Sequence, residues 1–260
     1  MTSLRWAIAD GWTITRRDLI HWVRDPTQVI FGVLFTIMIA LMFAYLFGGA
    51  MIVPGGGNYR EFLVPGMFGM NMLFGIGATM EAVRKDIDRG VTDRFRSMPM
   101  SNSAVLLGRS LADMLNSTLV LLALVGCGLA IGWRPNNSVG ETALAFALLL
   151  LVRYAFVWLG IYLGLVVKTP TVVQTLEFPV GFLANVFVAP STMPAWLGTI
   201  ADWNPLSSTV AAIRELFGNP GWGGDSWVTQ HAVLMAFVWP VVILAIFFPL
   251  AVRRYWRLSS

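Results

Sequence analysis

Charged residues are scarce in this chain of 260 residues, although hydrophobic residues are abundant. Only 12% of the residues are charged, whereas 57% are hydrophobic, and the mean hydropathy is +0.69. Soluble globular domains carry about 25% charged residues. The chain therefore has too little polar surface for a water-soluble fold, and it is too apolar for intrinsic disorder. The composition predicts an integral membrane protein.

Cysteine and histidine are scarcer still. Cys127 is the only cysteine, and His21 and His231 are the only histidines, so we expect neither a disulfide framework nor a metal site. The net charge of +4 does not indicate a nucleic-acid partner, because the basic residues flank apolar runs and do not line one soluble face.

Motifs for covalent chemistry are also missing. A phosphate-binding loop needs a lysine followed by serine or threonine, with a glycine six positions before the lysine. Lys85 is followed by Asp86, and Lys168, although followed by Thr169, has Tyr162 where that glycine belongs. We therefore predict that the chain is not an enzyme and binds no cofactor directly.

Long apolar runs recur along the chain. A helix needs about 20 apolar residues to cross a bilayer core of about 30 Å, and six runs approach or exceed this length. The predicted fold class is an all-α integral membrane protein with six transmembrane helices. The predicted spans are 29–48, 62–80, 114–133, 142–167, 172–193 and 232–252.

Lysine and arginine are distributed unevenly between the two sides of these spans. Fourteen lie on the side that holds both chain ends and three on the other, which places both termini in the cytoplasm of a multi-pass protein of the cell membrane. Residues 1–27 fit an amphipathic helix in the membrane interface, and a charged flank to the first span fits equally well. Residues 28–256 form the predicted transmembrane domain.

The cytoplasmic segment between the second and third spans has a pattern typical of docking. Gly90 and Pro99 bracket a short helix-capable stretch in which Phe95 and Met98 share one face and charged residues surround them. An apolar knob with a charged rim suits a partner's groove. From the residues alone, a solvated loop that only sets topology is the favoured reading.

Two longer runs in the sequence resemble a known family. They are Asp88-Arg-Gly-Val-Thr-Asp-Arg-Phe-Arg-Ser-Met-Pro99, followed by Ala-Val-Leu-Leu-Gly-Arg109, and the segment 182–218, with Arg24-Asp25-Pro26 before the first span as a further match. These runs are similar to type-2 ABC-exporter permeases, and most of all to the daunorubicin-resistance permease branch. The resemblance covers nearly the whole chain.

This resemblance implies a permease that works as a homodimer or heterodimer beside two copies of a separate ABC ATPase. ATP and magnesium are then expected at the ATPase. A coupling helix of the permease would receive the motion of the ATPase, and residues 168–171 would form a second, smaller contact with the ATPase. The coupling residues are Arg89, Gly90, Asp93, Arg94, Phe95, Arg96, Met98 and Pro99.

A second short helix is predicted between the fifth and sixth spans. Asn204 is a suitable helix cap with Pro205 at the first position, and Gly218 suits the exit. By resemblance this is a re-entrant helix of the outer leaflet, and it contains Arg214 and Glu215. Without the resemblance, an amphipathic surface loop is the favoured reading.

Polar residues inside the spans are the remaining candidates for a pathway or a structural role: Asn71, Arg153, Glu177 and Asn185. A charge at membrane depth costs at least about 2.5 kcal/mol, so it must face protein or a watery cavity. A structural pair between Arg153 and Glu177 is favoured over contact with cargo. Gly160 and Gly164 form a Gly-x-x-x-Gly pair that predicts close helix packing.

The leading functional hypothesis is a permease subunit of an ATP-driven exporter that moves a hydrophobic drug, antibiotic or lipid outward. Export of a polysaccharide or glycolipid by the same kind of permease is one alternative. A secondary transporter without an ATPase is another, but it is disfavoured because no internal repeat is evident and only two charges lie inside the spans. A membrane scaffold that transports nothing is the third.

Overall fold

The structure is a computed structural model, and it describes residues 27–47, 58–90, 102–187, 190, 193–221, 223–224 and 226–257. These residues form helices, turns and loops, with no β-strand among them. Within these ranges, four helices are long and apolar enough to cross a membrane, so the predicted all-helical membrane fold is confirmed at this level. They are α3 (Tyr59–Asp88), α5 (Asn102–Ala130), α6 (Val139–Val166) and α11 (Ala232–Arg257).

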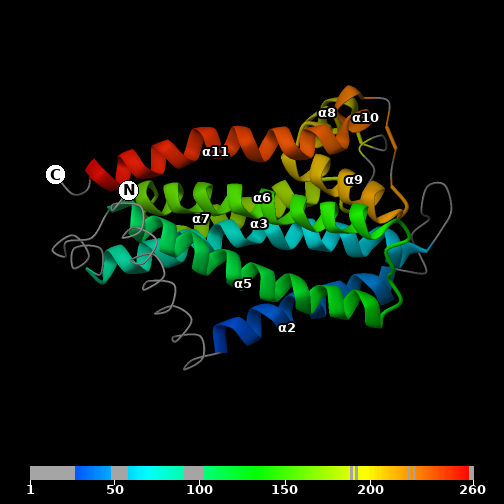
Figure 1. Ribbon diagram of the computed structural model, residues 1–260, viewed down its shortest axis with the longest axis horizontal. Coiled ribbons are helices and arrows are strands. Elements are labelled where there is room, and N and C mark those ends of the chain that lie inside the picture. The colour runs from blue at the N-terminus through cyan, green and yellow to red at the C-terminus, as the bar shows by residue number, and fades with distance from the viewer. Residues whose placement is uncertain are drawn as a thin grey trace.

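Helix α3 occupies the centre of the bundle and is the most buried of the four long helices. Helix α6 runs beside it, and α11 packs on the other side of α6, as Figure 1 shows. Helix α5 packs against α6 and α3 and also contacts α11, and α2 (Thr27–Met42) packs against α5. Helix α11 is the most exposed of the long helices.

The two ends of the bundle differ. At one end, α8 (Ala195–Asp202), α9 (Pro205–Phe217) and the one-turn α10 (Trp227–Gln230) gather near the start of α3 (Figure 1). We call this the α9 end. Helices α3 and α11 both finish at the opposite end, which we call the Gly90 end because α3 is followed there by Gly90.

The second predicted span is longer in the structure than its apolar run. Two i,i+4 ion pairs extend α3 past the run: Glu81 with Lys85, and Arg84 with Asp88. Such pairs stabilise a helical turn by about 0.2–0.5 kcal/mol each. Gly90 then ends the helix with φ of 65°, a conformation that glycine adopts without strain.

The first and fifth predicted spans are shorter helices. The first is α2 continued by the π-helical turn η1 (Phe43–Phe47). The fifth is α7 (Pro170–Leu183), which is about 21 Å long and stops well before residue 193. The chain becomes extended at Ala184, where side chains of α9 take over the hydrogen bonds of its backbone. Among the described residues, four helices are long and apolar enough to cross a membrane, and the apolar helix Ile30–Leu46 is shorter.

The close packing predicted for the Gly-x-x-x-Gly pair of α6 is confirmed. A Cβ atom on Gly160 would lie 2.8 Å from the carbonyl oxygen of Ile76, and one on Gly164 would lie 2.9 Å from that of Met80. Both oxygens belong to the backbone of α3, so neither can move aside cheaply. Helices α3 and α6 can approach this closely because glycine carries no side chain.

Alanine at position 160 tests this contact. We expect Gly160→Ala to lower the free energy of unfolding by about 1–3 kcal/mol, because the added methyl group overlaps the backbone of α3. Thermal unfolding in detergent measures the change. Gly126→Ala is the matched control, since nothing lies within 4 Å of its Cβ position. Equal stability of the two variants would contradict the packing.

Candidate functional site

Three ionisable side chains are buried against α3, and each lies over one of its glycines. The pairs are Arg214 over Gly66, Arg153 over Gly75 and Glu177 over Gly77. Because no water is available in a membrane interior, buried polar groups must find hydrogen-bond partners within the protein. The partners of these three residues define the candidate site.

Arg214 is 1% exposed, and each nitrogen of its guanidinium group donates a hydrogen bond. The Nε atom donates to the carbonyl oxygen of Phe62 at 3.0 Å, Nη1 to that of Asn185 at 2.8 Å and Nη2 to that of Val186 at 2.9 Å. Its Cζ atom also lies 3.7 Å from the centroid of the Phe62 ring. One side chain of α9 therefore joins α3 to the segment that follows α7.

The position of Arg214 is fixed because α9 is held at both ends. Asn204 accepts a hydrogen bond from the backbone of Leu206 at 2.9 Å and donates one to the carbonyl oxygen of Val180 in α7. At the other end, the carbonyl oxygen of Phe217 accepts from the backbone of Asn136 at 2.7 Å. The capped helix at Asn204 and Pro205 agrees with the prediction from the sequence.

Arg153 is 3% exposed and joins three helices near the middle of the bundle. Its Nε atom donates to Ser117 Oγ of α5 at 2.6 Å, and Nη2 donates to Thr79 Oγ1 of α3 at 3.1 Å. The guanidinium group lies where a Cβ atom on Gly75 would be. Helix α3 thus makes room for the charge of α6 and supplies one of its hydrogen-bond acceptors.

Glu177 of α7 is bound by the backbone of α3. Its Oε1 atom accepts a hydrogen bond from the amide of Gly77 at 2.5 Å. Among the described residues, no ion pair joins Glu177 to Arg153. The two charges face glycines of α3 that are two positions apart, which is about 200° around a helix. The predicted pairing is replaced by separate bonds from each residue.

At the Gly90 end, an ion pair links α3 to α5. Arg109 lies 3.3 Å from Asp86 and 3.6 Å from Asp113. Arg89 is the C-terminal cap of α3, and the amide of Gly90 donates to the carbonyl oxygen of Ile87. The other predicted coupling residues, Asp93, Arg94, Phe95, Arg96, Met98 and Pro99, lie outside the described residues.

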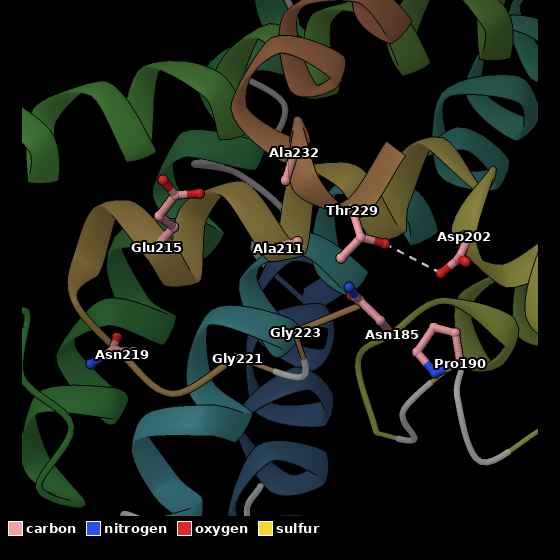
Figure 2. A pocket seen from close by; sticks show the side chains of 10 residues that line it. All are labelled: Asn185, Pro190, Asp202, Ala211, Glu215, Asn219, Gly221, Gly223, Thr229 and Ala232. Carbon is pink, nitrogen blue, oxygen red and sulfur yellow. Dashed lines mark hydrogen bonds between the residues drawn. The ribbon is translucent and has the colours of Figure 1, made fainter. Parts of the chain in front are cut away.

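The remaining candidates lie on α3 and at the α9 end. Asn71 is partly buried on α3. Asn185 is 6% exposed, and its backbone amide donates to Ser207 Oγ at 3.1 Å. The side chain of Asn185 lines a cavity of about 230 Å³ together with Glu215. Figure 2 shows this cavity between α9, the end of α8 and α10.

Comparison with known proteins identifies the family. Residues 10–217 match the ABC-2 type transporter family. The chain belongs to this family. It is 33% identical over 244 residues to the daunorubicin resistance ABC transporter permease protein DrrB1 of Streptomyces coeruleorubidus, covering 92% of this chain and 83% of that relative. The resemblance noted in the sequence is therefore confirmed.

Two further relatives of this ABC-2 permease are more distant. The putative transport permease ycf38 of Cyanophora paradoxa is 24% identical over 252 residues, which is 94% of this chain and 86% of the relative. The probable doxorubicin resistance ABC transporter permease protein DrrC of Mycobacterium tuberculosis is 21% identical over 210 residues, or 77% of this chain and 74% of the relative. The chain is homologous to permease subunits named for drug resistance.

Inspection of the sequence missed several residues that hold the α9 end of the permease. Asn219 accepts a hydrogen bond from Trp133 Nε1 at 2.8 Å and donates to the carbonyl oxygen of Arg134. The side chain of Asn137 donates to the carbonyl oxygen of Glu215 at 3.0 Å. These contacts join residues about 80 positions apart, and no local pattern in the sequence indicates them.

Removal of the Arg214 charge tests its structural role. We expect Arg214→Gln to lower the free energy of unfolding by about 3–5 kcal/mol, because two or more buried carbonyl groups lose their donor. Arg134→Gln, at an exposed arginine of the same end, should cost under about 1 kcal/mol. Chemical unfolding in detergent micelles measures both. Comparable losses in the two variants would contradict the proposed role.

A double-mutant cycle tests whether the guanidinium group of Arg153 packs directly against Gly75. Gly75→Ala should destabilise the permease because its methyl group displaces the guanidinium group. In an Arg153→Gln background the same methyl group has room, so its cost should shrink by about 0.5–3 kcal/mol. Thermal unfolding of the four proteins gives the coupling energy. Strictly additive effects would show that the two residues do not share this space.

Proposed function

We propose that this ABC-2 permease is the membrane subunit of an ATP-driven exporter that moves a hydrophobic drug, antibiotic or lipid outward. The observation that carries the proposal is the 33% identity, over 92% of the chain, to a permease named for daunorubicin resistance. A second relative is named for doxorubicin resistance. The charges of the bundle are bound to other helices, which suits a pathway for apolar cargo.

In this proposal, a partner protein supplies the energy for export. Neither lysine lies in a phosphate-binding loop, so ATP and magnesium bind at a separate ABC ATPase. Two ATPase copies act on two permease copies, either identical or different. Membership of the ABC-2 type transporter family supports this assembly.

The proposed topology has six spans, with α2 and η1 as the first and α7 as the fifth. The α9 end faces outward and the Gly90 end faces the cytoplasm, as the uneven distribution of lysine and arginine indicates. Helix α9 is about 20 Å long and largely buried, which suits a re-entrant helix. Both termini are cytoplasmic.

Coupling depends on the segment that joins α3 to α5. The motion of the ATPase reaches Gly90 and Asn102, the residues that flank this segment, and from there it is transmitted to both helices. They are linked by the ion pair of Asp86 with Arg109, and Arg153 of α6 bonds to both. A tilt of these spans therefore opens a path between two copies of the permease.

Proline at position 90 tests this coupling. Gly90 has φ of 65°, whereas proline requires about −65°, so Gly90→Pro should disrupt the start of the segment. We expect drug efflux and permease-stimulated ATP hydrolysis to fall at least about tenfold, while membrane insertion persists. Gly90→Asn is the control, because asparagine tolerates positive φ. Cells that also express the partner ATPase provide both measurements.

The same experiment separates the alternatives. Charge reversal by Arg94→Glu or Arg96→Glu should abolish efflux in the same way as Gly90→Pro. Normal efflux in all three variants would contradict the coupling role. Transport by the purified permease under an ion gradient, without any ATPase, would favour a secondary transporter. Glycolipid at the cell surface without drug efflux would identify a different cargo.

A further inference from the structure

The cavity at the α9 end has an acidic wall. Asp202 and Glu215 are among the residues that line it, and no lysine, arginine or histidine is among the described residues that line it. Thr229 Oγ1 donates a hydrogen bond to Asp202 Oδ1 at 3.4 Å, drawn as the dashed line in Figure 2. Arg214, the neighbour of Glu215, is bound by three carbonyl groups. The wall therefore favours a cation over an anion.

A buried hydroxyl group without a partner lies next to the cavity. Ser208 is 3% exposed, and its Oγ atom has no hydrogen-bond partner. Ser208 lines a second, much smaller cavity of about 10 Å³, which Asp202 and Thr229 also line. An unsatisfied buried polar group costs about 1–3 kcal/mol. A ligand that forms hydrogen bonds to both Ser208 and Asp202 therefore binds more tightly than one that bonds to Asp202 alone.

The cavity is large enough to hold only part of a ligand. Its volume of about 230 Å³ is roughly that of seven or eight water molecules. Pockets that enclose a whole drug-sized ligand measure about 300–1,000 Å³. The cavity therefore fits one polar group, and the rest of the ligand must lie outside.

Exposed tryptophans beside the cavity indicate where the rest of the ligand lies. Trp203 follows Asp202 directly, Trp227 is two residues from Thr229, and Trp196 lies on α8; their exposed fractions are 53%, 56% and 67%. Tryptophan is enriched where a membrane meets water. The cavity is thus at the depth of lipid head groups, so that an apolar tail attached to its ligand reaches the hydrocarbon.

We propose that this cavity binds the protonated amino group of an amphipathic molecule whose tail lies in the outer leaflet. The carboxylate of Asp202, which lines both cavities, accepts hydrogen bonds from the ammonium group, and Ser208 Oγ of the smaller cavity accepts one more. Glu215 adds negative charge to the wall. This inference rests on the proposed function for its role in export, where the ligand is either the cargo or a lipid with an amino head group.

Binding of matched amphiphiles tests the proposal. The purified full-length permease in dodecyl maltoside is titrated with decylamine and with decanol, which has the same tail without the charge. We expect decylamine to bind at least about tenfold more tightly, and Asp202→Asn to remove about tenfold of its affinity, as for a hydrogen bond to a charged group. Glu61→Gln, at an outer carboxylate that does not line the cavity, should change nothing.

A second variant keeps the test valid if Asp202→Asn does not fold. Ala211 lines the cavity, so Ala211→Leu should fill it and weaken decylamine binding while the unfolding temperature is kept. Equal affinities for decylamine and decanol would overturn the proposal. Unchanged decylamine affinity in both cavity variants would overturn it as well.

The source of the amino group is found by competition. Lysophosphatidylethanolamine should displace decylamine if the ligand is a lipid head group, whereas lysophosphatidylglycerol, which has hydroxyl groups instead, should not. Failure of both to compete assigns the site to an amphipathic amine cargo. Because these titrations need neither ATP nor an ATPase, loss of efflux with normal decylamine binding would contradict only the proposed function.

Discussion

A buried charge in a membrane protein must take its hydrogen bonds from the protein, and α3 meets this demand for three other helices. Its glycines leave space for Arg214, Arg153 and Glu177, and its backbone or side chains bond to all three. Lipid tails are as apolar as leucine, so burial of apolar area does little to hold transmembrane helices together. Close packing and hydrogen bonds of this kind therefore specify how the helices assemble.

This arrangement gives α3 contacts along its whole length. Arg214 fixes its first turns to α9 and to the segment after α7, Arg153 binds its middle to α5 and α6, and Arg109 binds its last turns to α5. In the proposed exporter, a displacement at the Gly90 end is carried along α3 to the α9 end. In the proposed exporter, this is the route by which ATP hydrolysis at a partner reaches the acidic cavity.

Composition and periodicity were enough to predict an all-helical membrane protein, the approximate positions of its apolar helices and the packing at Gly160. The caps of α9 followed from local rules at Asn204. The partners of the buried charges did not follow, because they depend on contacts far apart in the sequence. Arg214 was placed in a predicted re-entrant helix, but nothing in the sequence indicated that it is among the most buried side chains. The end of α7 was missed for the same reason.

Thermal unfolding of Gly77→Ala tests the central claim most directly. Helix propensity alone favours alanine over glycine by about 1 kcal/mol. A Cβ atom at this position would, however, lie 2.6 Å from Gln174 Cγ and 3.1 Å from Glu177 Oε2. Because of this overlap, we expect a lower unfolding temperature than that of the unmodified chain. An equal or higher unfolding temperature would show that α3 does not hold the buried charges through its glycines.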